Sequence, residues 1–190
     1  WKLVGNQVMI APLRVLDLDT PELRRLNPFT PRHAGLYSNT NLDSWDGFPW
    51  ERDLVLGHLR DGGPGGAPVT NTVFVTGDYH SFWAAPLTSD FDDDTAPVVA
   101  NEFASGAVSS GGGATTERIL FGTDENVRTY PSFAYTDMFR NGYGTVEATP
   151  DEMVVTFRMH DATVAASSPR PVVSFTLRDG DPRAERTLLR

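Results

Sequence analysis

The sequence contains no cysteine, which excludes a disulfide framework and any thiolate metal site within its 190 residues. It also lacks a long hydrophobic run: no apolar stretch approaches the ~20 residues of a membrane-spanning helix, so we expect no transmembrane segment. Basic residues are scarce as well, because 25 acidic residues outnumber 16 basic ones and give a net charge of -9. This charge argues against a protein that binds a phosphate backbone through a basic face, and we therefore expect no nucleic-acid partner.

Glycine and proline are frequent, with 17 and 14 residues, and few segments carry a helical pattern. Short apolar runs bounded by turn residues predict strands. These runs lie at Lys2 to Ile10, Val73 to Thr76, Val98 to Phe103 and Val172 to Leu177. Residues 142–149 and 153–160, separated by a Pro-Asp-Glu turn, predict a β-hairpin. The chain therefore favours a strand-rich α/β architecture with long loops and a C-terminal β-hairpin.

The clearest helix is expected from Trp50 to Leu59, followed by a Gly-Gly-Pro stop. Its apolar residues recur at helical spacing, together with one histidine: Leu54, Val55, His58 and Leu59. Residues 12–49 are otherwise expected to be mostly loop, with a short helix at 20–26. No linker or repeat divides the chain, so we expect one folded unit over 1–178 and a polar tail over 179–190.

The strongest chemical signal is VTGDYHSFW at 75–83, where Asp78 and His80 follow a buried strand. In an extended segment, residues i and i+2 face the same way with Cα atoms ~7 Å apart. A carboxylate and an imidazole so placed can each reach one of two metal ions ~3.5 to 4 Å apart, the spacing of two-metal phosphoesterases. Gly77 would permit the turn that exposes both side chains. The alternative interpretation is that Asp78 caps a turn and His80 is a hydrogen-bonded loop residue.

The wider run NTVFVTGDYHSFWAA at 71–85 resembles the last metal motif of PhoD-type phosphoesterases. That group, alkaline phosphatase D, includes iron-dependent phospholipases D of the Streptomyces type. Other segments resemble the family's landmarks in the same order, namely WKLVGNQVMIAPL (1–13), DSWDGFPWERDLVLGHL (43–59), PVVANEF (97–103) and NGYGTVEATPDEMVVTFR (141–158). The resemblance covers residues 1 to about 160, and the combination is more specific than any single motif.

The resemblance implies a metallophosphoesterase (calcineurin-like) fold, a β-sandwich flanked by helices, of which this chain would be the C-terminal part. It also implies that Asp78 and His80 are catalytic, with iron bound by His80 and calcium bound by Asp78. The chemistry agrees, because imidazole suits iron and carboxylate suits calcium. Asn6, at the end of the first expected strand, is a weaker candidate ligand of the second metal, and a turn-forming role is its alternative.

By the same resemblance, the activity would be hydrolysis of a phosphoric ester, with a metal-bound hydroxide attacking phosphorus. A monoester, a diester and a phospholipid, the last for a phospholipase D, all remain open as substrates. Candidate residues of the substrate pocket are Trp45, Asp46, Phe48, Trp83 and Ser109. For the aromatic members, packing in the core is the alternative. After the Glu-Phe dipeptide many relatives carry Gly-x-Ser-x-Ser/Thr-Ser, whereas this chain has ASGAVSS at 104–110.

The family's upstream ligands, among them a cysteine, an Asp-rich motif and an asparagine, have no counterpart in this sequence. Two or three ligands cannot complete two ions that need about four or more each. We therefore expect an internal start at the strand-like WKLV, and an N-terminal half of the same enzyme supplied as a separate chain. The resemblance also implies that the protein is secreted.

A function of another class is compatible with the same absence of upstream ligands. The chain would then be a non-catalytic, β-rich binding or regulatory module that retains the family scaffold. Bound metal distinguishes the two functions, because only the hydrolase requires it.

Overall fold

The computed structural model describes residues 1–17, 35–37, 43–62, 65–111 and 133–189. In chain order, these residues form β1 (Lys2–Asn6), β2 (Arg14–Asp17), β3 (Gly35–Tyr37), the 3₁₀ helix η1 (Trp45–Gly47), α2 (Pro49–Asp61), β4 (Thr72–Thr76), β5 (Phe82–Thr88), β6 (Val98–Ala104), β7 (Tyr135–Asp137), β8 (Asn141–Ala148), β9 (Glu152–His160), β10 (Arg170–Arg178) and β11 (Asp181–Leu188). Within these ranges, no helix is long and apolar enough to cross a membrane. The short helix expected at 20–26 lies outside the described residues.

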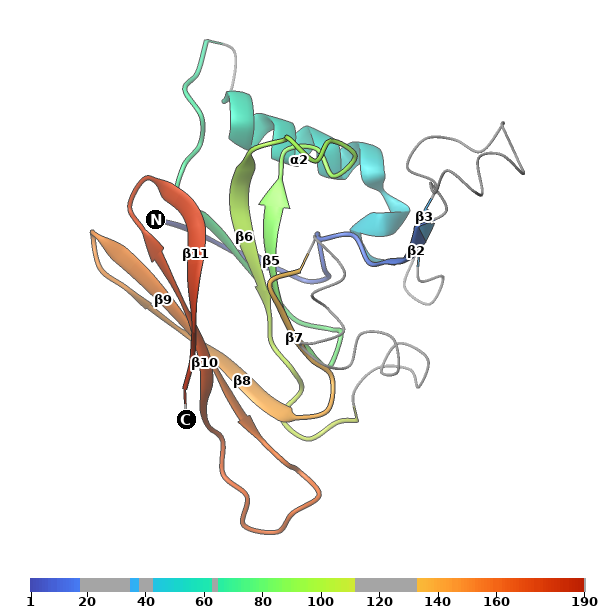
Figure 1. Cartoon of the computed structure of the whole chain (residues 1–190), viewed down its shortest axis with the longest axis vertical. Helices are drawn as coiled ribbons and strands as arrows, with labels where there is room; N and C mark the ends of the chain where they lie inside the picture. Colours follow the sequence, from blue (N-terminus) through green and yellow to red (C-terminus); the bar gives the residue numbers. More distant parts are fainter. Residues whose placement is uncertain (18–34, 38–42, 63–64, 112–132, 190) are drawn as a thin grey trace.

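The strands form two main sheets (Figure 1). One has five strands in the order β1-β4-β6-β5-β7, and the other has four antiparallel strands in the order β11-β10-β9-β8. A separate two-stranded sheet joins β2 and β3. In the larger sheet, β1, β4 and β6 are parallel neighbours. Their carboxyl ends therefore meet at one edge of the sheet, which is where ligand-binding residues gather in such folds.

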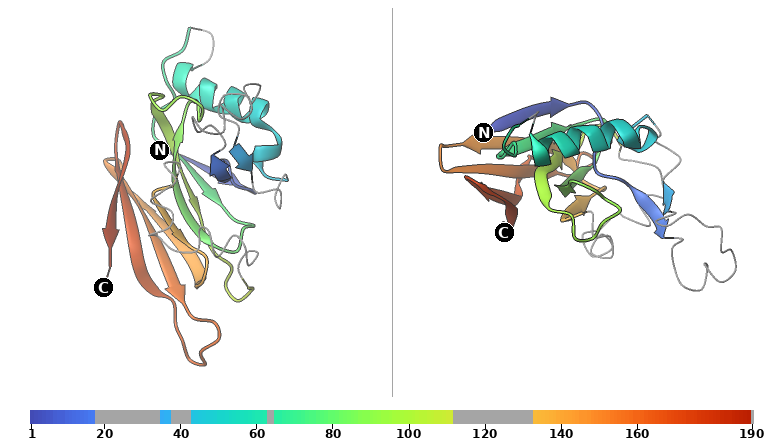
Figure 2. Two further views of the ribbon diagram at one scale, coloured as in Figure 1. Left: turned by 45° about the vertical axis from the view of Figure 1, so that its right-hand side comes forward. Right: turned by 90° about the horizontal axis from the view of Figure 1, so that it is seen from above.

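The five-stranded sheet is the middle of three layers, between the four-stranded sheet and α2 (Figure 2). Consecutive residues of β4 enter different cores, because side chains alternate along a strand. Val73 packs into the core between the sheets, where the rings of Phe157 and Phe175 lie 5.5 Å apart. Phe74 packs into the core beneath α2, together with Leu56. The expected strand-rich sandwich is confirmed in this coarse form, and the described residues place one α-helix on one outer face.

Most of the predicted strands are present. β4, β6, β10 and the β8–β9 hairpin lie within a residue or two of their predicted bounds. The first strand is shorter than the predicted 2–10, because β1 ends at Asn6. Beyond it, the backbone N–H groups of Ile10 and Ala11 donate to the carboxylate of Glu102 and to no neighbouring strand.

The predicted helix is present as α2, and it ends where Gly62 adopts a φ of 71°. Of the four residues at helical spacing, Leu59 is buried and Val55 is partly buried against the core. Leu54 is 54% exposed and His58 is exposed, whereas the face against the sheet consists of Arg52, Leu56 and Leu59. The apolar pattern does not reveal this face, because one of its positions is Arg52, whose guanidinium is buried in an ion pair with Asp46.

Five of the described strands were not predicted, and two of them, β2 and β3, lie in the segment 12–49 that was expected to be mostly loop. β5 and β7 pair antiparallel inside the larger sheet. The tail expected over 179–190 is wrong, because residues 181–188 form β11, which pairs with β10. The turn between them carries Gly180 at a φ of 76°, and Ala184 packs against the core between the sheets. A polar strand is stable here because its backbone pairs with β10 while most of its side chains face solvent.

Candidate metal centre

The candidate site lies at the carboxyl ends of β1, β4 and β6. Asn6 is the last residue of β1, and Asp78 and His80 follow β4, which ends at Thr76. Asn6 and Thr76 are register partners in the parallel pair β1–β4. The fold therefore brings the end of the first strand beside the Asp78–His80 segment, although more than 70 residues separate them in sequence.

A buried glutamate organises this edge. Glu102 of β6 is 1% exposed, and its carboxylate accepts hydrogen bonds from the backbone N–H of Ile10 at 2.9 Å and of Ala11 at 2.9 Å. It also accepts from the hydroxyl of Thr76 at 2.7 Å and from the side chain of Asn6. Burial raises the pKa of Glu102, while these four donors act in the opposite direction. Because it contacts residues at or beyond the ends of β1 and β4, Glu102 fixes their positions at the site.

The side chain of Asn6 is oriented by two acceptors. Its Nδ2 donates to the carbonyl oxygen of Val8, and the side chain also bonds to the carboxylate of Glu102. Both partners accept hydrogen bonds, so the nitrogen of the amide must face them. The carbonyl oxygen Oδ1 is thereby turned away from both. Asn6 therefore has the turn-forming contact that was considered for it, and its role as a metal ligand stays a prediction.

Asp78 and His80 lie in a turn rather than in an extended segment. Their φ angles are 68° and 52°, in the left-handed region. The prediction that alternation along a strand aligns them was therefore wrong, and so was the assignment of the turn to Gly77, whose φ is not positive. Asp and His are among the side chains that tolerate this region, and strained residues of this kind concentrate at functional sites. Both side chains are exposed.

The ring of His80 is held by one hydrogen bond, in which Nδ1 donates to the carbonyl oxygen of Gly111 at 3.1 Å. Because a carbonyl only accepts, the proton is on Nδ1, and the lone pair of Nε2 is available to a cation. This is the arrangement in which metal-binding histidines are commonly held. Imidazole nitrogen, carboxylate oxygen and amide oxygen are the donor types that suit iron and calcium.

The described residues do not complete such a centre. No group of three or more His, Cys, Asp or Glu side chains comes together in the described part of the chain. Asp78, His80 and Asn6 would therefore form only a part of a two-metal site.

The predicted pocket residues have different environments. Trp83 is 1% exposed and packs against Tyr79 and Phe133, with ring centroids at 5.7 and 4.9 Å. It is a core residue, as the packing interpretation proposed. Asp46 is also withdrawn from solvent, because it pairs with Arg52 at 2.8 Å and accepts from the N–H of Leu13.

Trp45 and Phe48 line a shallow hollow together with Val8 and Glu51. Val8 lies two residues beyond Asn6, so this hollow adjoins the segment that follows β1. Ser109 is exposed on the loop that follows β6, two residues before Gly111. Phe48 and Ser109 are therefore exposed, whereas Trp45 is half-buried and also packs against the core beneath α2.

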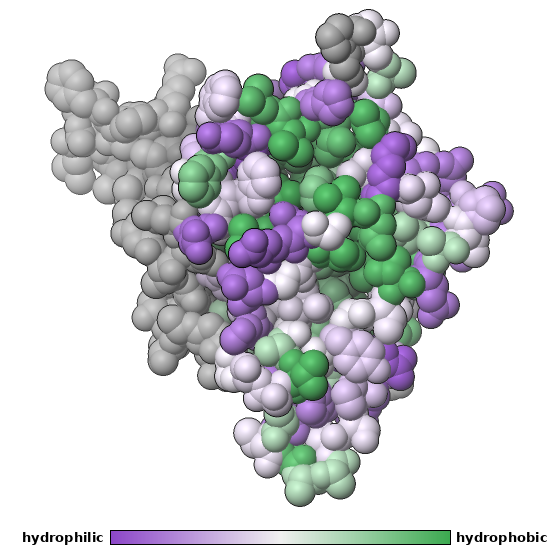
Figure 3. All heavy atoms as spheres, turned by 180° about the vertical axis from the view of Figure 1, so that it is seen from behind, coloured by the Kyte–Doolittle hydropathy of each residue, from purple (hydrophilic) through white to green (hydrophobic). Residues whose placement is uncertain are grey.

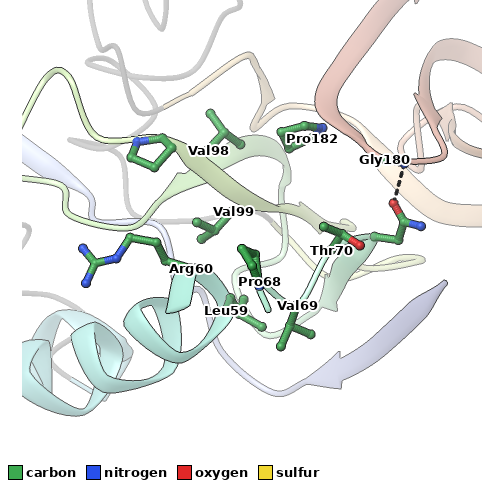
Figure 4. Close-up of a pocket in the computed structure, with 11 residues that line it drawn as sticks. Leu59, Arg60, Pro68, Val69, Thr70, Val98, Val99, Gly180 and Pro182 are labelled. Carbon is green, nitrogen blue, oxygen red and sulfur yellow. Dashed lines mark hydrogen bonds between the residues drawn. The ribbon is translucent and has the colours of Figure 1, made fainter. Parts of the chain in front are cut away.

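Another cavity lies away from the candidate ligands. A mostly apolar cavity of about 190 Å³ lies at the opposite end of β4, among Leu59, Val69 and Val98 (Figure 4). Val69 precedes β4 and Asp78 follows it, so the five residues of that strand, roughly 17 Å, separate the cavity from the candidate ligands. The cavity contains no candidate ligand.

Comparison with known proteins identifies relatives of this chain in both sequence and fold. The sequence profile of the PhoD-like phosphatase family matches residues 1–157. Alkaline phosphatase D of Bacillus subtilis (strain 168) is 29% identical over 119 residues, which are 63% of this chain and 19% of that protein. A solved structure of PhoD superposes with a TM-score of 0.72 at 21% identity, over 98% of this chain and 31% of that one. The chain thus spans about a fifth of the curated relative and about a third of the solved structure.

Proposed function

This chain belongs to the PhoD-like phosphatase family, and on that premise we propose that it is the C-terminal part of a metal-dependent phosphoric ester hydrolase. The observation that carries the proposal is the geometry of His80. Its Nδ1 donates to the carbonyl oxygen of Gly111, and its exposed ring follows Asp78 by two residues, beyond the carboxyl end of β4. Asp78 and His80 are the proposed catalytic residues, within a calcineurin-like metallophosphoesterase domain.

The proposed cofactors are iron, held by His80, and calcium, held by Asp78 and the Oδ1 atom of Asn6. When bound, such ions supply a nucleophilic oxygen at neutral pH and stabilise charge on the phosphoryl group. The contribution of this chain is to orient the ligands. Gly111 fixes the tautomer of His80, and Glu102 fixes the amide of Asn6. Trp45, Phe48 and Ser109 are the proposed walls of the substrate pocket.

The remaining ligands are proposed to come from the N-terminal half of the same enzyme on a separate chain. Two observations support a partner at β1. This strand pairs only with β4, so one of its edges has no neighbouring strand among the described residues. Its side chains Leu3 and Val4 are 52% and 37% exposed, and Figure 3 shows a hydrophobic patch on the face of the molecule from which β1 is seen. An open edge with apolar side chains is suited to accept a further strand.

The proposed substrate is a phosphate monoester or diester, and a phospholipid is included as the substrate of a phospholipase D. We also propose that the protein is secreted, by analogy with its family.

The decisive variant is His80→Ala in the assembled enzyme. We expect loss of bound iron and a fall in phosphodiesterase turnover of at least about 100-fold, because a metal ligand is removed from an intact fold. His58→Ala is the matched control, since His58 is exposed on α2, away from the carboxyl ends of the strands. Metal content by mass spectrometry and turnover are measured together. Wild-type metal content and turnover in the His80 variant would disprove the proposal.

A binding or regulatory module remains the second candidate, and it is favoured by the absence of a complete ligand cluster in the described residues. This alternative expects no stoichiometric metal in the native assembly and no effect of His80→Ala on partner binding. Iron and calcium in the native assembly, lost together with turnover in the His80 variant, would exclude it.

A further inference from the structure

The loop that follows β6 is held by side chains from a distant hairpin. Asn141, at the start of β8, donates through Nδ2 to two carbonyl oxygens of this loop, those of Ala107 at 3.1 Å and Ser110 at 2.7 Å. His160, at the end of β9, donates through Nε2 to the carbonyl oxygen of Val108 at 3.0 Å. Three carbonyl groups within four consecutive residues are therefore fixed by two side chains.

The two side chains act from one place on the hairpin. Asn141 and His160 are register partners in the β8–β9 pair, so they lie opposite each other at its open end. The backbone N–H of Gly142 adds a further bond to Ala107 at 2.9 Å. Because a paired hairpin is rigid, this arrangement positions the loop as a unit.

The residue that follows the held carbonyls is Gly111, whose carbonyl oxygen accepts the hydrogen bond from Nδ1 of His80. We propose that Asn141, with His160, is a positioning residue for the candidate metal ligand His80. The pair holds residues 107–111 so that the carbonyl of Gly111 selects the Nδ1–H tautomer and leaves Nε2 available to the cation. This inference rests on the proposed function of His80.

The geometry explains why the two donors are needed. Residues 109–111 are exposed, and the loop contains glycines at 106 and 111, so its own packing does not fix the direction of the Gly111 carbonyl. A carbonyl that rotates away would leave the imidazole free to exchange its proton between the two nitrogens. A fraction of the protein would then present a protonated Nε2 to the metal, and the apparent affinity would fall in proportion.

The test uses Asn141→Asp in the full-length protein. The carboxylate has the shape of the amide but no N–H, and it would face the carbonyl oxygens of Ala107 and Ser110. Asn141→Ala is a second variant that removes the donor without adding charge. Thr145→Val on the same strand is the matched control, because its hydroxyl bonds only within the hairpin, to the carbonyl oxygen of Thr156.

Two measurements are made on each variant. In the metal-free protein at mildly alkaline pH, ring ¹⁵N shifts of His80 report its tautomer. We expect Nδ1–H in the wild type and in Thr145→Val, and a mixture in both Asn141 variants. Iron affinity, measured by competition with a chelator, is expected to fall about tenfold in both Asn141 variants.

The outcomes separate this inference from the proposed function. An unchanged tautomer and unchanged iron affinity in a folded Asn141→Ala protein would overturn the inference, while His80→Ala still lost its metal. If His80→Ala retained its metal, the proposed function itself would fail. A loss of affinity in Thr145→Val as large as that in Asn141→Ala would also count against the inference, because it would assign the effect to hairpin stability.

Discussion

At the scale of single residues, Glu102 has the largest structural role at the candidate site. Its carboxylate is the acceptor for two backbone N–H groups that have no strand partner, those of Ile10 and Ala11. We expect Glu102→Ala to lower the free energy of unfolding by about 3–5 kcal/mol, because each unsatisfied buried N–H costs about 1–3 kcal/mol. Urea denaturation measures this. A loss below about 1 kcal/mol would show that water replaces the carboxylate without penalty.

The titration of Glu102 gives a second prediction. Burial raises its pKa above the ordinary value of 4.5, so the folded protein holds this proton more tightly than the unfolded chain. The associated stabilisation is complete below pH 4.5 and is lost as the pH rises through the folded pKa. Glu102→Gln cannot titrate, so the wild-type advantage over this variant should shrink with rising pH in that window. Denaturation across the window tests it, and an advantage that grows with pH would mean that the hydrogen bonds outweigh burial.

These residues also show what sequence reasoning can reach at this scale. Asp78 and His80 were identified from residue type and from their place after a strand, although the backbone there is left-handed and not extended. Their roles stay predictions. Glu102 was not identified, because its importance comes from donors that lie far away in the sequence, from Thr76 to Asn6, and no local pattern reveals them. The available signal was a glutamate inside the strand predicted from Val98 to Phe103.

At the scale of elements, α2 packs on the sheet by apolar contact, and a buried ion pair attaches it to the preceding 3₁₀ helix η1. The side chains of Arg52 and Asp46 are only 4% and 6% exposed. We expect Arg52→Ala to cost about 3–5 kcal/mol, because it leaves a buried carboxylate without its cation. Arg60→Ala on the same helix is the control, since its pair with Asp61 is largely exposed and should change stability by less than about 1 kcal/mol. Equal losses in thermal or urea unfolding would contradict the prediction.

The β8–β9 hairpin requires a glycine at one position. Gly142 has a φ of 147°, and a Cβ atom there would overlap the carbonyl oxygen of Arg158. Gly142→Ala should therefore destabilise the protein by about 2–4 kcal/mol. Gly144→Ala, two residues along the same strand, should cost less than about 1 kcal/mol, because its nearest neighbours would lie at 3.7 Å. Urea denaturation of both variants measures the two changes in the free energy of unfolding. An unchanged stability of Gly142→Ala would contradict the prediction and mean that the strand shifts without loss of stability.

The predicted strands are stabilised by their own apolar residues, whereas the strands that were not predicted depend on pairing with their neighbours. β4, β6 and β9 carry apolar or alternating patterns that depend on their own residues. β5 contains Pro86, which argues locally against a strand, yet the strand persists between β6 and β7. β11 is mostly polar and forms because β10 offers it an edge. Both strands, β5 and β11, form because neighbouring strands pair with them, and a local sequence pattern does not indicate such pairing.

At the scale of the whole molecule, the two cores have different degrees of closure. The core beneath α2 is bounded by the helix and by the middle sheet, whereas the core between the sheets opens toward β1, where Leu3 is half exposed. The candidate ligand Asn6 lies at the carboxyl end of that same strand. A partner that pairs with β1 would thus cover the exposed side chain of Leu3 and lie beside the strand that ends at the candidate ligand Asn6. The proposed separate chain and the proposed dinuclear centre are therefore one structural hypothesis.

That hypothesis predicts the effect of a charge on β1. Leu3→Glu should weaken association with the N-terminal half by about tenfold or more, because a carboxylate would be buried at an apolar contact. Leu188→Glu on β11 is the matched control: Leu188 is 59% exposed against 52% for Leu3, and it lies on the other sheet. Native mass spectrometry of the purified protein measures the fraction of chain in a species heavier than 20.8 kDa. Because the β1 strand would be shared, iron and calcium should leave the protein together with the partner in the Leu3 variant. A wild-type protein found only at 20.8 kDa, or equal losses in both variants, would rule out a partner at β1.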